Sequence, residues 1–259
     1  MSKEDLKLFL DIYRENPCQV LPNAFWKTAK ELGQSHLSVA RDSNEALTFL
    51  AVQDNERILS CWCRTPEKIS RHISVEDISF ALVHDNCLKM FNGGNFVKKT
   101  AYFRLQHRGA PPNYHCPFGY QFEAVNPQDD LPRVVSFINQ CYENIRVDEK
   151  IVQSWLDHPV YDPNLWIWIK DSLTSQHAAL GIAEIDKRVP EASLEWIQVH
   201  PECQGKGLGS ALVAELLRRV APDVELTTVS GEVDNPSDPE KLYRKVGFTG
   251  SDVWWLLKA

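Results

Sequence analysis

The chain has 259 residues, 43% hydrophobic and 24% charged, an ordinary globular composition that is long enough to bury a substantial core. Its formal net charge of −7 argues against general binding to nucleic acid, because an acidic chain repels polyphosphate. The N-terminal residues 1–10 are charged and lack a signal peptide's apolar core, and no apolar run approaches the roughly 20 residues of a membrane span. We expect a soluble, cytoplasmic protein, without a membrane partner, acting as a monomer or homodimer.

Seven cysteines are present, an odd number without the spacing of a disulfide framework, which is typical of a reduced compartment. Cys61 and Cys63 flank Trp62 in an apparent strand, so their side chains would share one face. A zinc site would need two further ligands nearby, and none stands at the usual spacing. We therefore expect no metal.

In the first 107 residues, patterns predict two helices, a hairpin, a third helix and a strand. The first helix is expected to begin at Ser2, to carry an apolar face and to end at Asn16-Pro17. A second, short helix is expected over 23–32. Strands are expected over 46–53 and 57–64, joined by a turn, and over 99–106. The segment 75–90 is interpreted as a helix that stops at Asn92-Gly93-Gly94.

Residues 108–118 hold three prolines and one glycine, a density that blocks helix and sheet pairing and predicts a domain boundary. The domains expected are therefore 1–107, a linker at 108–118, and 119–259. The last segment has a regular order of β-α-α-β-β-β-α-β-α-β, which predicts the α/β class (an α+β mixed sheet with helices on its faces). Its elements are expected at 120–125, 130–145, 148–156, 165–169, 178–186, 192–199, 208–220, 225–231, 239–246 and 253–257.

The most informative segment follows the strand that ends at Val199. It reads Gln204-Gly205-Lys206-Gly207-Leu208-Gly209-Ser210, and a helix opens at about Leu208. The first N–H groups of a helix lack internal partners and carry partial positive charge, so they favour a phosphate. Glycines let a phosphate approach these groups, and Lys206 and Ser210 could add donors.

Two nucleotide motifs are excluded by spacing. The dinucleotide fingerprint needs Gly-x-Gly-x-x-Gly, whereas this turn spaces its glycines alternately at 205, 207 and 209. The mononucleotide loop needs Gly-Lys-Ser/Thr, but Lys206 is followed by glycine. The plain alternative is a surface turn that caps a helix.

A second pattern runs from Asn235 to Phe248. Either Asp238 or a Ser237–Glu240 capping box could start a helix at Pro239, and Gly247 could end it. Tyr243 would then lie about one turn inside this helix, where its plain role would be packing on the sheet.

Together, Ile197-Gln-Val199, Gln204-x-x-Gly207-x-Gly209, Asn235, Tyr243 and Gly247-Phe248 resemble the GNAT superfamily of N-acetyltransferases. The resemblance covers about residues 119–259 and implies the GNAT fold with an additional N-terminal α/β domain. It implies transfer of an acetyl group from acetyl-CoA (coenzyme A) to a primary amine, on a small molecule or a peptide, by direct attack in a ternary complex.

The resemblance also implies roles for matching positions. The backbone of Ile197 and Val199 would meet the pantetheine arm and the thioester carbonyl. The turn would hold the pyrophosphate through Gln204, Gly205, Lys206, Gly207, Leu208, Gly209 and Ser210. Asn235 would contact the cofactor arm, and Tyr243 would protonate the leaving thiolate.

A base must also deprotonate the amine, which is charged at neutral pH. Strand alternation places Ser193, Glu195 and Ile197 on one face, which makes Glu195 the first candidate. Its plain alternative is a structural ion pair. Glu184 is the reserve base, and Cys203 near His200 is a disfavoured covalent nucleophile.

Four further hypotheses stay open. The protein could be an acyl-CoA sensor without catalysis, or a structural protein with a fossil fold. The second is disfavoured because nothing structural is expected to require three glycines in the turn. The sequence from Leu88 to Phe96 weakly resembles that of 242–248, so the N-terminal half could be a degenerate GNAT-like copy.

The sequence also contains six tryptophans in or near the inferred site region. They could line the site of an apolar or cationic acceptor or fill the core: Trp155, Trp166, Trp168, Trp196, Trp254 and Trp255.

Overall fold

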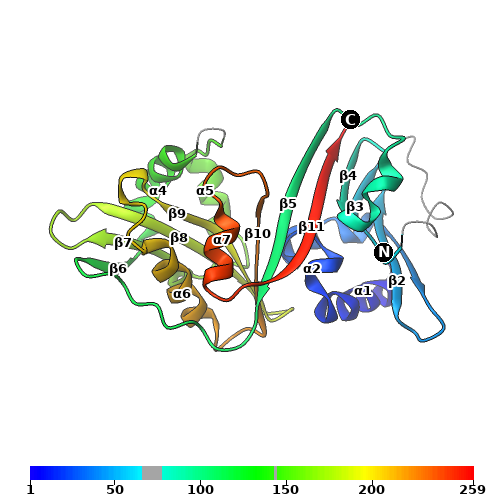
Figure 1. The fold of residues 1–259 in the computed structure, drawn as a ribbon, viewed down its shortest axis with the longest axis horizontal. Helices are drawn as coiled ribbons and strands as arrows, with labels where there is room; N and C mark the ends of the chain where they lie inside the picture. Colours follow the sequence, from blue (N-terminus) through cyan, green and yellow to red (C-terminus); the bar gives the residue numbers. More distant parts are fainter. Residues whose placement is uncertain (66–77, 143–144) are drawn as a thin grey trace. The chain divides into compact units, whose positions relative to one another are not determined.

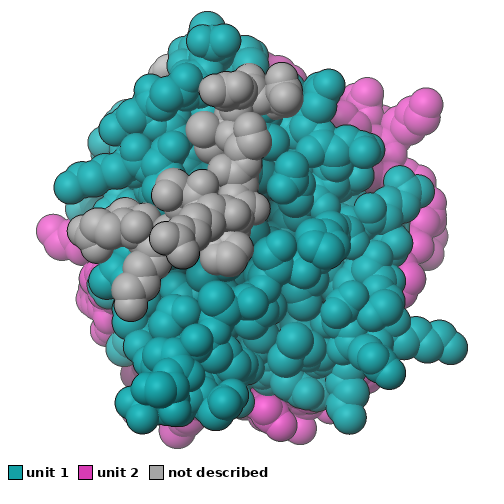
Figure 2. Space-filling view, turned by 90° about the vertical axis from the view of Figure 1, so that its right-hand side faces the viewer, with its two compact units in different colours: residues 1–106, 228–240, 249–259 teal, residues 107–227, 241–248 magenta. Residues whose placement is uncertain are grey.

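A computed structural model describes residues 1–65, 78–142 and 145–259. The chain divides into two compact units (Figure 2). The first contains residues 1–106, 228–240 and 249–259, and the second contains residues 107–227 and 241–248. No helix in the described ranges is long and apolar enough to cross a bilayer.

The first unit combines a sheet with short helices. Its helices are α1 (Lys3–Glu15), α2 (Pro17–Val20), α3 (Phe25–Ala29), η1 (Leu32–Gln34) and η3 (Asp85–Phe91). Its strands are β1 (His36–Arg41), β2 (Leu47–Asp54), β3 (Arg57–Cys63), β4 (Phe80–His84), β5 (Lys98–His107), most of β10 (Leu226–Glu232) and β11 (Thr249–Lys258).

The strand order in this unit is β1-β2-β3-β4-β11-β5-β10. β1, β2 and β3 are antiparallel neighbours, whereas β3 and β4 run parallel. The last strand, β11, lies antiparallel to both β4 and β5, so Trp254 pairs with His84 on one side and Tyr102 on the other (Figure 1). The end of the chain therefore completes the sheet of the N-terminal half.

The hairpin, the first helix and the strand near 99–106 are confirmed. Ser2 caps α1 in a capping box with Asp5, whose side chain accepts from the Ser2 backbone N–H. The prediction of a helix over 75–90 is wrong for those of its residues that the structure describes. The apolar run Phe80–His84 is a strand between β3 and β11, and 85–91 form a 3₁₀ helix; 75–77 lie outside the described residues. A short apolar run fits a buried strand as well as a helix, and here the sheet partners decide.

The second unit contains an antiparallel sheet in the order β6-β7-β8-β9. Its strands are β6 (Tyr120–Ala124), β7 (Trp166–Asp171), β8 (His177–Asp186) and β9 (Glu191–Val199). Its helices are α4 (Pro127–Cys141), α5 (Glu149–Leu156), η4 (Pro163–Leu165), η5 (Pro201–Cys203), α6 (Leu208–Val220) and most of α7 (Pro239–Lys245). All the elements expected after residue 119 are confirmed within a few residues.

Helix α6 packs on β8 and β9 with its apolar face buried. Gly181 of β8 permits this approach, because a Cβ there would lie 2.8 Å from Leu212 Cδ1 and 3.0 Å from Leu216 Cδ1. α4 and α5 cover a second core that includes Val134, Phe137, Trp166 and Trp168. The turn before α6 is thus attached to a firmly packed helix.

The two halves of the chain have a similar order of elements. In the first half, helices precede three antiparallel strands (β1, β2, β3), which are followed by a connection, β4, η3 and β5. In the second half, helices precede β7, β8 and β9, which are followed by α6, β10, α7 and β11.

Candidate functional site

The glycine turn joins β9 to α6 through η5 in the second unit. Residues 204–207 are exposed, and Gly207 is the N-cap of the 13-residue helix α6, with no side-chain hydrogen bond at the cap. Helix-opening N–H groups without a side-chain partner are free to bind an anion. The turn therefore has the local structure of a phosphate site.

Each glycine of the turn has a structural reason to be there. Gly205 and Gly207 have φ of +77° and +80°, a backbone conformation that residues other than glycine rarely adopt. A Cβ at Gly209 would lie 3.1 Å from Leu242 Cδ2, where α6 meets α7. The expectation that nothing structural requires three glycines is therefore wrong, and their presence alone does not separate a binding turn from a structural one.

Strand β9 carries a bulge at Glu195. Trp196 pairs with Ile182 and Leu194 with Ala183, so Glu195 is the extra residue. Beyond a bulge the alternation of faces shifts by one, and the expectation that Ser193 and Ile197 share a face is therefore wrong. The half-buried Glu195 lies on the Ser193 side, because Ser193 Oγ donates a hydrogen bond of 2.5 Å to its Oε1.

Tyr243 is buried in α7, with 7% of its surface exposed. Burial raises the pKa of its phenol well above the ordinary value, and the neighbouring Tyr142 and the Glu195 carboxylate raise it further. The phenol is consequently protonated at neutral pH and close enough to Glu195 to sense its charge. The structure thus brings together the two residues expected to be catalytic.

Asn235 lies in the turn that precedes α7 and belongs to the first unit. Its Oδ1 accepts hydrogen bonds from the backbone N–H and the Oγ of Ser237, at 3.0 and 2.8 Å. Asn235 therefore shapes the start of α7, and its contact with a cofactor stays a prediction.

The two reserve residues lie elsewhere. Glu184 is buried on β8 opposite Ser193. Cys203 is half-buried at the end of η5, and within the described residues no hydrogen bond joins its Sγ to His200. The His200 ring accepts from the Glu202 N–H instead and packs 6.1 Å from Phe137. This geometry lacks the base that a nucleophilic cysteine needs.

A cleft of about 640 Å³ lies beside the turn in the second unit. Its walls come from α4, the start of β6, the β7–β8 turn and the segment after β9. They include the charged and titratable residues Arg133, Asp171, His177, His200, Glu202 and Lys206. Sequence patterns singled out Lys206, but none marked Arg133 or His177, which tertiary folding brings to this cleft.

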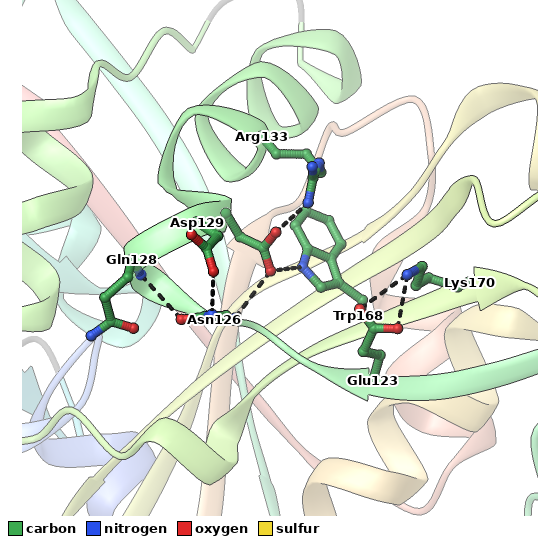
Figure 3. A network of polar contacts seen from close by, with 8 residues as sticks. Glu123, Asn126, Gln128, Asp129, Arg133, Trp168 and Lys170 are labelled. Atoms are coloured by element: carbon green, nitrogen blue, oxygen red, sulfur yellow. Dashed lines mark hydrogen bonds and ion pairs between the residues drawn. The ribbon is translucent and has the colours of Figure 1, made fainter.

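A polar network fixes α4 above β7 at this cleft (Figure 3). Asp130 is buried and accepts hydrogen bonds from the Asn126 backbone N–H at 3.0 Å and from Trp168 Nε1 at 3.3 Å. Arg133 pairs with its other carboxylate oxygen. A buried carboxylate satisfied in this way holds the helix in one position, with the Arg133 side chain at the cleft.

Comparisons with known proteins agree with this geometry. Residues 163–250 match the family model described as an acetyltransferase (GNAT) domain. No curated protein matches the chain in sequence. The fold resembles a GCN5-related N-acetyltransferase from Sphaerobacter thermophilus, with a TM-score of 0.67 and 12% identity over 91% of this chain and 85% of that one.

Two further solved structures have the same fold. A GNAT-family acetyltransferase from Colwellia psychrerythraea has a TM-score of 0.61 and 14% identity, covering 100% of this chain and 97% of its own. A tandem GNAT protein from the clavulanic acid biosynthesis pathway has a TM-score of 0.52 and 14% identity, covering 87% and 83%.

The fold and the family match define the class of protein. Residues 163–250 match the GNAT acetyltransferase domain model, and the fold of most of the chain resembles that of solved GNAT structures. The expected resemblance to GNAT proteins and the expected fold class are therefore confirmed, and the nature of the N-terminal half stays a prediction.

Proposed function

We propose that this protein transfers an acetyl group from acetyl-CoA to a primary amine by direct attack. The observation that carries the proposal is the presence in one unit of a helix N-terminus without a side-chain cap at the glycine turn and of the Glu195–Tyr243 pair. The turn offers anion binding and the pair offers proton transfer, which are the two things this reaction needs.

The exposed turn fits a pyrophosphate. Gly205 and Gly207 leave no Cβ over its backbone, and the N–H groups that open α6 carry partial positive charge. Lys206 adds a charge beside the cleft. In this proposal the backbone of Ile197 and Val199 holds the pantetheine arm, and a contact from Asn235 stays a prediction. The bound cofactor supplies a thioester carbon for the amine to attack.

Glu195 serves as the base. The bulge places Glu195 outside the regular strand pairing, and the Ser193 hydroxyl donates a hydrogen bond to one oxygen of its carboxylate. A carboxylate at this position attracts the ammonium form of the acceptor and takes its proton, directly or through water.

Tyr243 serves as the proton donor. A phenol is protonated at neutral pH, and burial keeps it so, which means that the proton is present when the sulfur leaves. A phenolic acid transfers a proton to a thiolate only when the two are held in position, and burial in α7 holds the phenol.

A non-catalytic acyl-CoA sensor is the rival function. It would need the turn, but it has no use for a carboxylate near enough to a buried phenol to raise its pKa. We favour the enzyme for that reason.

The substitution Glu195→Gln tests the enzyme directly by removing the base while keeping the shape of the side chain. With acetyl-CoA and a primary amine, thiol release should fall roughly 10²-fold or more at pH 7. The loss should shrink as the pH rises, because the amine then deprotonates without help. Thiol release that is equal in both proteins would contradict the proposal.

The parallel element order of the two halves supports a related proposal. We infer that the N-terminal half is a degenerate copy of the same fold that does not bind the cofactor. The connection from β3 to β4, at the place of the glycine turn in the second half, contains no glycine at residues 64–79. This half then completes the sheet by accepting β11 between β4 and β5.

A further inference from the structure

Three aromatic side chains in the second unit form a surface that is only partly covered. Trp196 of β9 stacks on Trp155 of α5 with ring centroids 5.1 Å apart at 23°. Tyr142, at the end of α4, meets Trp196 edge-on at 5.8 Å and 80°. We call these three residues the aromatic face.

The aromatic face differs from the tryptophans that fill the core. Trp166 and Trp168 of β7 are 1% and 0% exposed, whereas Tyr142, Trp155 and Trp196 all keep accessible surface. The aromatic face is supported from below by the core, because Trp155 also packs 6.3 Å from Trp166.

The aromatic face lies next to the catalytic pair. Trp196 directly follows the bulged Glu195, and the shift in alternation puts it on the same side of β9 as Ser193, whose hydroxyl binds Glu195. Tyr142 lies at the end of α4 and is near enough to Tyr243 to contribute to the raised pKa of its phenol. A molecule whose amine reaches Glu195 would therefore have its body beside these rings.

The carboxylate of Glu195 and the rings of the aromatic face together favour one kind of acceptor. The carboxylate attracts a single ammonium group, and aromatic rings pack best against another flat apolar group, in stacked or edge-on geometry. A long polycationic or peptide acceptor would instead need further carboxylates or backbone partners along its length.

We propose that Tyr142, Trp155 and Trp196 form the acceptor subsite and select a primary amine joined by a short linker to an aromatic ring. The inference rests on the proposed function, whose site it extends. The aromatic face makes a specificity contact, and the proton transfers stay with Glu195 and Tyr243.

The test compares kcat/KM for three amines with acetyl-CoA: 2-phenylethylamine, n-butylamine and 1,4-diaminobutane. The wild type should prefer 2-phenylethylamine by about 10-fold or more, the range that one apolar pocket supplies. Trp196→Leu and Trp155→Leu should reduce that preference to about 3-fold or less through a higher KM for the aryl amine. Affinity for acetyl-CoA, measured by calorimetry, should not change.

Matched variants separate specificity from folding. Trp255→Leu changes another half-buried tryptophan, in the first unit, and should keep the full preference. Trp155→Phe keeps an aromatic ring and should keep most of the preference even if a leucine variant unfolds. A wild type that prefers diaminobutane, or leucine variants that are folded and still prefer the aryl amine, would overturn the inference.

The outcomes also separate this inference from the proposed function. Acetylation of amines without preference for the aryl compound overturns the acceptor subsite alone. Absence of acetyl transfer to every amine, together with absence of acetyl-CoA binding, overturns both.

Discussion

At the scale of residues, the site depends on groups whose chemistry is set by burial and neighbours. Tyr243 and Glu195 could be proposed from the sequence because a motif and a strand position marked them, and their roles stay predictions. Tyr142 could not, because it ends α4 without a motif, and only folding brings it near Tyr243. Glu195 was found for a partly wrong reason, since regular alternation was assumed and the bulge was not visible in the residues.

Replacing Tyr243 by phenylalanine removes the proposed acid and leaves the ring. We expect kcat to fall roughly 10²-fold or more, with the dissociation constant of acetyl-CoA unchanged within about 2-fold. Tyr161→Phe, which changes another tyrosine of the second unit, should retain wild-type turnover. Steady-state kinetics and calorimetry make the comparison, and an unchanged kcat in Tyr243→Phe would exclude the phenol as the acid.

His177 makes stability depend on pH. Burial first, and then the positive charges of Arg133 and Lys170, lower its pKa below the ordinary 6.5. The window lies between the ordinary pKa of 6.5 in the unfolded chain and the lower pKa of His177 in the folded protein. In this pH range the unfolded chain binds more protons than the folded one, so the free energy of unfolding falls as the pH falls. The thermal unfolding midpoint should therefore fall between pH 7 and 5, and less steeply in His177→Gln. Equal slopes in the two proteins would refute this contribution.

At the scale of elements, local signals located the second unit well because its helices carry clear apolar stripes and caps. α6 was predicted at its observed bounds, Leu208–Val220. The segment 75–90 was mistaken because a short apolar run is compatible with either period, and its strand Phe80–His84 is decided by the partners β3 and β11.

The packing of α6 on β8 can be tested at Gly181. A Cβ there meets Leu212 and Leu216 at 2.8 to 3.0 Å, so Gly181→Ala should destabilise the fold by about 1–3 kcal/mol. Gly33→Ala is the control, because a Cβ at that glycine meets nothing within 4 Å. Urea unfolding measures both, and a Gly181→Ala protein as stable as the control would show that the leucines adjust freely.

At the scale of the whole molecule, the pairing of β11 shows what a linear sequence leaves open. Its residues predict a strand, but they do not say that it lies between β4 and β5 of the first unit, which are far away along the chain. Such pairing depends on which edges are available once the other strands have formed. The degenerate-copy proposal explains this pairing, because each half of the chain would then have a position in the sheet for a final strand.

A binding stoichiometry tests that proposal. The first half has no glycine turn after its third antiparallel strand, so we expect one acetyl-CoA per chain in calorimetry. Two equivalent sites would show that both halves bind the cofactor and that the first copy is not degenerate.

The central claim, that the glycine turn holds the cofactor, is tested most directly by titrating acetyl-CoA into the wild type, Gly207→Glu and Gly109→Glu. Gly207 and Gly109 have φ of +80° and +90°, so both variants carry similar backbone strain and the same added charge. Only Gly207 lies at the N-terminus of α6. We predict binding by the wild type and by Gly109→Glu, and loss of binding in Gly207→Glu. Equal binding by all three folded proteins would contradict the account.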